Sequence, residues 1–209
     1  MKILFQGDSV TDAGREGGLL QPNRGLGLGY PIFVAGQLLS RYPEKGFEVL
    51  NRGISGNRVV DLYARWKIDA LNLKPDVISI LIGVNDTWHE FGNGNGVEVD
   101  RYEMVYHELL SWTKKVLPDV RLVLCEPFVL PFGAVGEKWI DEMNSRRAIV
   151  KALASEFGAV FAPFQSVLND ACGRAPQEHW LADGVHPTTA GHALLADAWV
   201  EAAAGVLGI

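Results

Sequence analysis

Lys2-Ile3-Leu4-Phe5-Gln6-Gly7-Asp8-Ser9 begins as a short apolar strand and ends in a polar turn. In a parallel α/β sheet, ligands bind beyond the carboxyl ends of the strands, and Ser9 is expected at such an end. Taken alone, Gly-Asp-Ser is also ordinary turn chemistry, and Ser9 could be a turn or helix-capping serine. The stretch therefore predicts a functional site only if other polar clusters reach the same edge.

The rest of the chain repeats this pattern, because short apolar runs alternate with longer stretches of helical character. Strands are expected over residues 3–6, 47–51, 77–82, 121–126 and 159–161, and helices over 30–42, 59–71, 101–117, 138–157 and 188–207. The third and fourth strands are almost continuously apolar, as expected for strands buried on both faces. The alternation predicts an α/β fold in which helices cover both faces of a parallel sheet. The polar segment 91–96 is expected to be a surface loop.

Length and composition indicate an ordinary globular protein. We expect residues 1–209 to form a single domain, because this length suffices for one sizeable core. The formal net charge of −6 argues against nucleic acid or an anionic membrane as a partner. No run is long and uncharged enough to span a bilayer, and the first apolar run is too short for a signal peptide, so a cytoplasmic location is expected.

The sequence predicts no metal and no organic cofactor. Cys125 and Cys172 cannot form a disulfide framework and lack the spacing of metal ligands. The histidines show no metal-binding spacing such as H-E-x-x-H. Residues 25–29, Gly-Leu-Gly-Leu-Gly, do not fit the dinucleotide-binding pattern and do not follow a predicted strand.

Three polar clusters follow predicted strands or precede the last predicted helix. They are residues 51–57 (Asn-Arg-Gly-Ile-Ser-Gly-Asn), 83–86 (Gly-Val-Asn-Asp) and 180–187 (Trp-Leu-Ala-Asp-Gly-Val-His-Pro). Since the carboxyl ends of parallel strands share one edge, the clusters can converge on Ser9. Asp8 and Asp86 are expected to shape their turns, not to react.

Together, the clusters supply the groups that acyl transfer needs. A serine hydroxyl is a poor nucleophile until a base takes its proton, and His186 is the candidate base, since imidazole exchanges protons near neutral pH. Asp183, three residues earlier, can accept the other imidazole N–H and fix the tautomer. The backbone N–H groups of Ser9 and Gly53 and the side-chain amide of Asn85 are the candidate oxyanion donors.

These clusters, in this order, resemble the GDSL family and specifically the SGNH hydrolases, which are named for a serine, a glycine, an asparagine and a histidine. Ser9, Gly53, Asn85 and His186 match those four, and Asp183 matches the aspartate three residues before the histidine. The resemblance runs from residue 5 to about residue 192. It implies a three-layer α/β/α sandwich with a five-stranded parallel sheet, broadly flavodoxin-like. The chain reads Gly-Asp-Ser-Val where the family name has Gly-Asp-Ser-Leu, a departure at a non-catalytic position.

The substrate is less closely defined. Gly-Leu-Gly-Tyr at 27–30, the 51–57 cluster and Trp88 after Asn-Asp resemble the single-domain acetylxylan esterases of this family. That resemblance implies an oligomeric, intracellular enzyme that deacetylates xylo-oligosaccharides. Trp88 and Trp180, close in sequence to the clusters, are the candidate substrate-binding residues, although either could simply pack in the core.

Two other functions stay open on the sequence. One is a thioesterase or lysophospholipase of the same fold, although no long apolar lid is evident. The other is a carbohydrate-binding protein without catalysis, which would have no need for the serine, histidine, aspartate and asparagine set.

Overall fold

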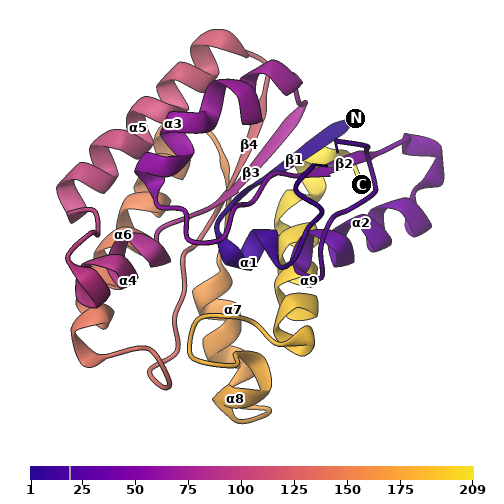
Figure 1. Cartoon of the computed structure of the whole chain (residues 1–209). Helices are drawn as coiled ribbons and strands as arrows, with labels where there is room; N and C mark the ends of the chain where they lie inside the picture. The colour runs from indigo at the N-terminus through magenta and orange to yellow at the C-terminus, as the bar shows by residue number, and fades with distance from the viewer. Residues whose placement is uncertain (19) are drawn as a thin grey trace.

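The sheet is parallel and lies between two layers of helices (Figure 1). The computed structural model describes residues 1–18 and 20–209, and its five strands lie in the order β2-β1-β3-β4-β5. The strands are β1 Lys2–Gly7, β2 Glu48–Asn51, β3 Val77–Leu81, β4 Arg121–Cys125 and β5 Val160–Ala162. The predicted α/β sandwich is confirmed, and each predicted strand is correct to within one residue at either end.

Each face of the sheet is covered by its own group of helices. One face carries α2 Tyr30–Arg41, α7 Phe164–Ala171 and α9 Thr189–Leu207, and the other carries α3 Val59–Asp69, α5 Val99–Val116 and α6 Glu137–Glu156. In β1, Ile3 and Phe5 enter the first core and Leu4 enters the second, because successive side chains of a strand point to opposite faces.

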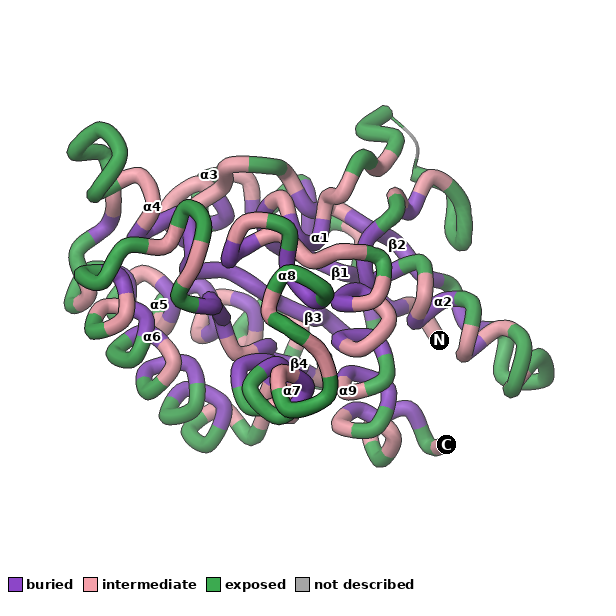
Figure 2. The backbone as a smooth tube through the Cα atoms, turned by 90° about the horizontal axis from the view of Figure 1, so that it is seen from below, coloured by how far each residue is buried: buried purple, intermediate pink, exposed green. Residues whose placement is uncertain are grey.

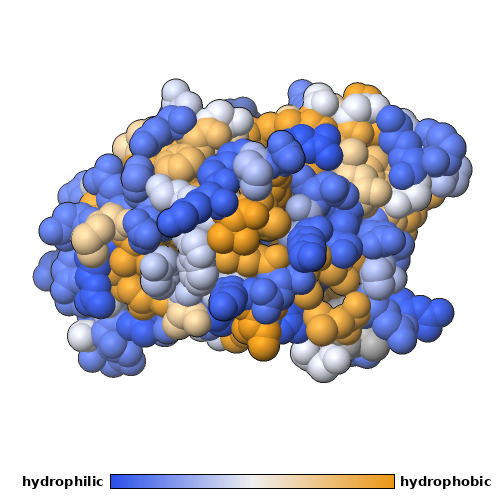
Figure 3. All heavy atoms as spheres, turned by 90° about the horizontal axis from the view of Figure 1, so that it is seen from above, coloured by the Kyte–Doolittle hydropathy of each residue, from blue (hydrophilic) through white to orange (hydrophobic). Residues whose placement is uncertain are grey.

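The strand order places the ends of β1 and β3 at a topological switch point. From β1 the chain first adds β2 on one side and then β3 on the other. In open α/β sheets, ligands bind at such a point, outside the carboxyl ends of the strands. Figure 2 views the molecule from this edge, and Figure 3 shows the opposite edge, where apolar and hydrophilic side chains are interspersed.

Several shorter helices were not predicted: α1 Ser9–Asp12, α4 Val84–Asn93 and α8 Gln177–Trp180, besides α7. The expectation of a loop over residues 91–96 is wrong for residues 91–93, which form the last turn of α4. The helix continues because Phe91 stacks on Trp139 of α6, with ring centroids 6.4 Å apart, and it ends at Gly94, which adopts the left-handed conformation.

His192 of α9 caps helix α2. The N-cap residue Gly29 has no side chain to accept the first amide protons, and the N–H of Tyr30 donates instead to Nδ1 of His192 at 3.1 Å. His192 is only 7% exposed. Burial, helped by the nearby His186, lowers the pKa of His192 from 6.5 to about 4. The neutral imidazole therefore ties the two helices together at the site edge of the sheet.

We predict that this cap makes the protein sensitive to acid. Because the folded-state pKa is depressed, the contribution of His192 to stability is complete above pH 6.5 and is lost as the pH falls towards about 4. His192→Asn keeps an acceptor at the position of Nδ1 but does not titrate. Urea unfolding at several pH values should show a shallower loss of unfolding free energy in this variant than in the wild type. Parallel pH curves would contradict the prediction, and His89→Asn is the matched control.

Candidate active site

Ser9 lies at the carboxyl edge of the sheet, where β1 passes directly into α1. The side chain of Asp8 caps α1 by accepting the N–H of Val10 at 3.0 Å. This cap directs Ser9 Oγ towards His186, and the distance between Oγ and Nε2 is 2.9 Å. The structure thus joins two predicted site residues that lie 177 positions apart.

Asp183 orients His186 through both carboxylate oxygens. Oδ2 lies 2.8 Å from Nδ1 of the imidazole, while Oδ1 accepts the backbone N–H groups of His186 at 2.8 Å and Val185 at 3.0 Å. Partial burial acts to raise the pKa of Asp183, but these hydrogen bonds outweigh it and hold the pKa below its usual range. The ionised carboxylate favours the tautomer with the proton on Nδ1, which leaves Nε2 free to accept a proton from Ser9.

The loop that follows β4 holds the segment carrying Asp183. The N–H of Leu130 donates to the carbonyl of Gly184 at 2.9 Å, and the N–H of Ala134 donates to the carbonyl of Asp183 at 2.8 Å. Gly184 has φ +90° and packs against the backbone of Phe132, so a side chain would not fit there. The Asp–His segment is therefore fixed by backbone contacts, although it lies outside the sheet.

Gly53, a predicted oxyanion donor, lies in the loop that follows β2. Its N–H is buried and donates to Oδ1 of Asn51 at 2.9 Å, so binding an oxyanion would require it to share its proton between two acceptors. A Cβ at Gly53 would lie only 2.5 Å from the backbone nitrogen of Asp12 in α1. The glycine is needed for close packing of the 51–57 loop against α1.

Asn85 and Ser9, the other predicted oxyanion donors, each keep an N–H proton without an acceptor among the described residues. Nδ2 of Asn85 donates one proton to the carbonyl of Asn57 at 3.1 Å, which leaves its second proton for another acceptor. The N–H of Ser9, at the start of α1, donates to no group within residues 1–18 and 20–209. Both donors are fixed at the carboxyl edge, one after β1 and the other after β3.

The two predicted tryptophans differ in their surroundings. The ring of Trp88, in α4, lies 5.7 Å from the imidazole of His186 between centroids. Trp180 follows the core-packing alternative that the sequence left open, because this side chain is only 8% exposed and belongs to the core. Its Nε1 donates to the carbonyl of Ala175 at 3.3 Å, and the guanidinium of Arg174 covers its ring.

Two buried carboxyl groups lie beneath the site. Burial raises the pKa of Asp8 to about 7, opposed by its hydrogen bond from Val10 and reinforced by the charge of Asp86. Burial likewise raises the pKa of Asp86 to about 6, against the opposing charge of Arg146. Asp86 accepts the N–H of Val59 at 3.0 Å, at the start of α3. Both carboxyls thus act as caps for helices around the site.

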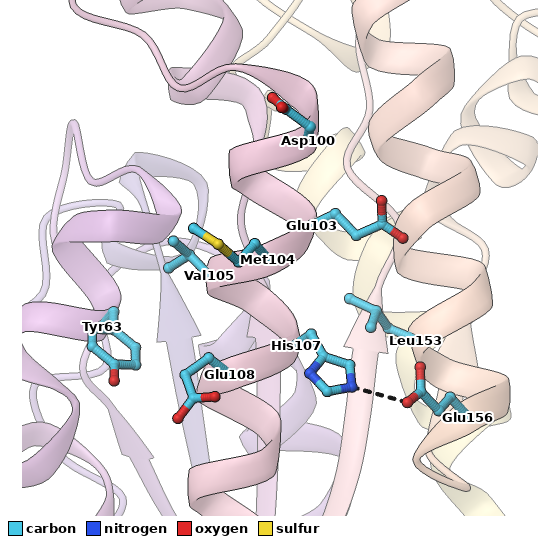
Figure 4. A pocket seen from close by; sticks show the side chains of 9 residues that line it. All are labelled: Tyr63, Asp100, Glu103, Met104, Val105, His107, Glu108, Leu153 and Glu156. Carbon is cyan, nitrogen blue, oxygen red and sulfur yellow. Dashed lines mark hydrogen bonds and ion pairs between the residues drawn. The ribbon is translucent and has the colours of Figure 1, made fainter.

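A large hollow lies away from these residues. It has a volume of about 720 Å³ and runs along α5, between α3 and α6 (Figure 4). Exposed Met104 and several carboxylates line it, and His107 bonds to Glu156 at 2.9 Å on one side. None of the predicted site residues reaches it.

Within residues 1–18 and 20–209, no group of three or more His, Cys, Asp or Glu side chains is placed to hold a metal ion. No helix in this part of the chain combines the length and apolar character needed to cross a membrane.

Comparison with known proteins gives a consistent assignment. The sequence profile of the GDSL-like Lipase/Acylhydrolase family matches residues 5–194. The acetylxylan esterase of Geobacillus stearothermophilus is 37% identical over 205 residues, which cover 96% of this chain and 92% of that protein. Its crystal structure superposes with a TM-score of 0.89 at 35% identity, covering 100% of this chain and 94% of that one.

A second structure is also similar. A Parabacteroides merdae protein described as a GDSL-like lipase gives a TM-score of 0.93 at 45% identity, covering 96% of this chain and 94% of that one. On the sequence profile and these relatives, the chain belongs to the GDSL-like lipase/acylhydrolase family and is a carboxylic ester hydrolase.

Proposed function

We propose that this protein is a serine esterase that removes acetyl groups from carbohydrates such as xylo-oligosaccharides, through an acyl-enzyme on Ser9. The observation that carries the proposal is the chain of hydrogen bonds from Ser9 Oγ to His186, 2.9 Å, and from His186 to Asp183, 2.8 Å. The acetylxylan esterase from Geobacillus stearothermophilus, 37% identical over nearly the whole chain, supports the choice of substrate.

In the first half of the reaction, Ser9 Oγ attacks the ester carbonyl carbon while His186 Nε2 takes the hydroxyl proton. The negative charge that develops on the carbonyl oxygen is stabilised by donors already in place. We assign this role to the N–H of Ser9, the side-chain amide of Asn85 and the N–H of Gly53, which would share its proton between Asn51 and the oxyanion. The bond to the sugar oxygen then breaks, and His186 returns its proton to the leaving alkoxide.

In the second half, His186 takes a proton from water, and the resulting hydroxide attacks the acyl carbon. Collapse of this intermediate releases acetate, while His186 protonates Ser9 Oγ. Asp183 stays ionised throughout and stabilises the imidazolium that forms in each half.

Relatives support the assignment of these three residues. Solved structures of the Geobacillus stearothermophilus esterase include catalytic mutants in which a serine, an aspartate or a histidine is replaced by alanine. In that enzyme the mutated aspartate and histidine lie three positions apart, as Asp183 and His186 do here.

A cavity of about 10 Å³ is lined by Val10, Val84 and Val185, the chain neighbours of Ser9, Asn85 and His186. It holds about one water-sized group, and the three site residues do not line it. The expected preference for a short acyl group therefore rests on the similarity to the acetylxylan esterase.

The proposal predicts a specific pattern of acetate release. Acetylated xylo-oligosaccharides and 4-nitrophenyl acetate should be hydrolysed, and kcat/KM should fall steadily from acetyl to octanoyl 4-nitrophenyl esters. Coupled measurement of acetate across a panel of acetylated sugars checks the first part. A rise in kcat/KM towards the octanoyl ester would instead assign the protein to the lipolytic members of the family.

Ser9→Ala should abolish turnover of 4-nitrophenyl acetate, because it removes the nucleophile. Mass spectrometry after treatment with a serine-reactive phosphonate should show one adduct, on Ser9, in the wild type and none in the variant. Full turnover by Ser9→Ala would show that the covalent mechanism is wrong. Ser145→Ala, at an exposed position of α6, is the matched control.

Asn85→Ala should lower kcat by about 10²–10³, the cost of removing one oxyanion donor, with little change in KM. Steady-state kinetics on 4-nitrophenyl acetate measure this effect, and Asn93→Ala at the exposed end of the same helix is the control. A change confined to KM would indicate that Asn85 contributes to substrate binding and not to stabilisation of the transition state.

A further inference from the structure

An aromatic strip extends from the catalytic imidazole to the surface. We define it by Trp88 and Phe91 of α4 and Trp139 of α6. Trp88 lies 5.7 Å from the ring of His186 and 5.3 Å from the ring of Trp139, and Phe91 stacks on Trp139 at 6.4 Å with an interplanar angle of 18°. The three rings therefore form a continuous chain of contacts that begins at the catalytic imidazole.

The exposure of these rings differs along the strip. Trp139 is 5% exposed and packs with Val84, Met143 and Val185 in a small core of its own. Phe91 is 42% exposed, although a ring in a packing cluster gains most when it is fully buried. The buried tryptophan thus supports a phenylalanine that presents part of its ring to solvent.

The helical spacing of Trp88 and Phe91 matches the length of a sugar residue. Trp88 and Phe91 lie three positions apart on α4 and therefore on the same side of the helix. Three residues rise about 4.5 Å along a helix, a length comparable to that of one pyranose residue. Two aromatic side chains at this spacing can therefore contact successive sugar rings of an extended oligosaccharide.

We propose that this strip is the acceptor platform of the enzyme, on which the sugar residues next to the acetylated one stack, with Phe91 as the outer contact. The apolar C–H face of a pyranose packs on an aromatic ring while its hydroxyl groups stay in water. Trp139 is a positioning residue that holds both rings from behind. This inference rests on the proposed carbohydrate esterase function and adds that the enzyme prefers oligosaccharides to single sugars.

The strip predicts that Phe91→Ala lowers the ratio of kcat/KM for an acetylated xylotetraose to kcat/KM for 4-nitrophenyl acetate about tenfold, through KM. A lost aromatic contact of this kind commonly weakens binding by a factor of that order. Phe91→Tyr keeps the ring and should restore the ratio. Met104→Ala, which removes another exposed apolar side chain, 63% exposed and on α5, should leave it at the wild-type value.

Binding measured without turnover separates the platform from the chemistry. Unacetylated xylotetraose should bind to Ser9→Ala, as measured by calorimetry and by tryptophan fluorescence, more tightly than xylose does. Adding Phe91→Ala should weaken the binding of xylotetraose about tenfold and remove most of the preference over xylose.

The outcomes distinguish the two proposals. Acetate release from acetylated xylose and xylotetraose with equal kcat/KM, or an unchanged ratio in Phe91→Ala, overturns the platform and leaves the esterase function intact. Binding of xylotetraose that depends on Phe91, without any release of acetate from sugars, overturns the proposed reaction and supports the platform. A Phe91→Tyr variant as defective as Phe91→Ala would also overturn the stacking role.

Discussion

The position of Ser9 depends on direct packing of the backbone around α1. A Cβ at Gly7 would clash with the carbonyl of Leu81 in the neighbouring strand, and one at Gly53 would lie 2.5 Å from the nitrogen of Asp12. Since no side chain fits between these segments, α1 is held by β1, by β3 and by the loop after β2. The backbone of Ser9 is therefore positioned by contacts that take no part in the reaction. Only the side-chain rotamer of Ser9 then decides whether Oγ contacts His186.

The same packing buries two carboxyl groups near a site where negative charge develops. A charged Asp8 next to an oxyanion would oppose the transition state, since the local dielectric is low. Burial reduces this effect for Asp8, because it raises the pKa of that carboxyl to about 7, whereas Asp86, with a pKa of about 6, stays largely ionised at neutral pH beside Arg146. Asp183 differs, because hydrogen bonds from its own loop keep its pKa low. The three carboxyl groups therefore have different roles. Asp183 is ionised and orients the base, whereas Asp8 and Asp86 cap helices.

Sequence reasoning succeeded where a residue's role follows from local pattern and strand direction. Apolar runs located the strands, and the shared carboxyl edge brought Ser9, Asn85 and the 180–187 cluster together. It was incomplete where the outcome depends on a side-chain contact that the local pattern does not show. The hydrogen bond from the N–H of Gly53 to Asn51 is one such contact. The sequence also left open whether Trp180 is exposed or packs in the core, as it does beneath Arg174. In α4, contact with Trp139 overrode the local preference of a glycine- and asparagine-rich segment for a loop.

Helix α4 connects the chemistry to the choice of substrate. Its first turn carries Asn85, and the following turns carry Trp88 and Phe91. Side-chain hydrogen bonds anchor α4 to α6, because Thr87 Oγ1 donates to Glu142 at 3.0 Å and accepts a hydrogen bond from Arg146 at 2.9 Å. A helix fixed in this way cannot shift its aromatic side chains without also moving the amide proposed to bind the oxyanion. Sugar binding on the proposed platform would therefore position the ester and the oxyanion donor together, since both depend on the same rigid element.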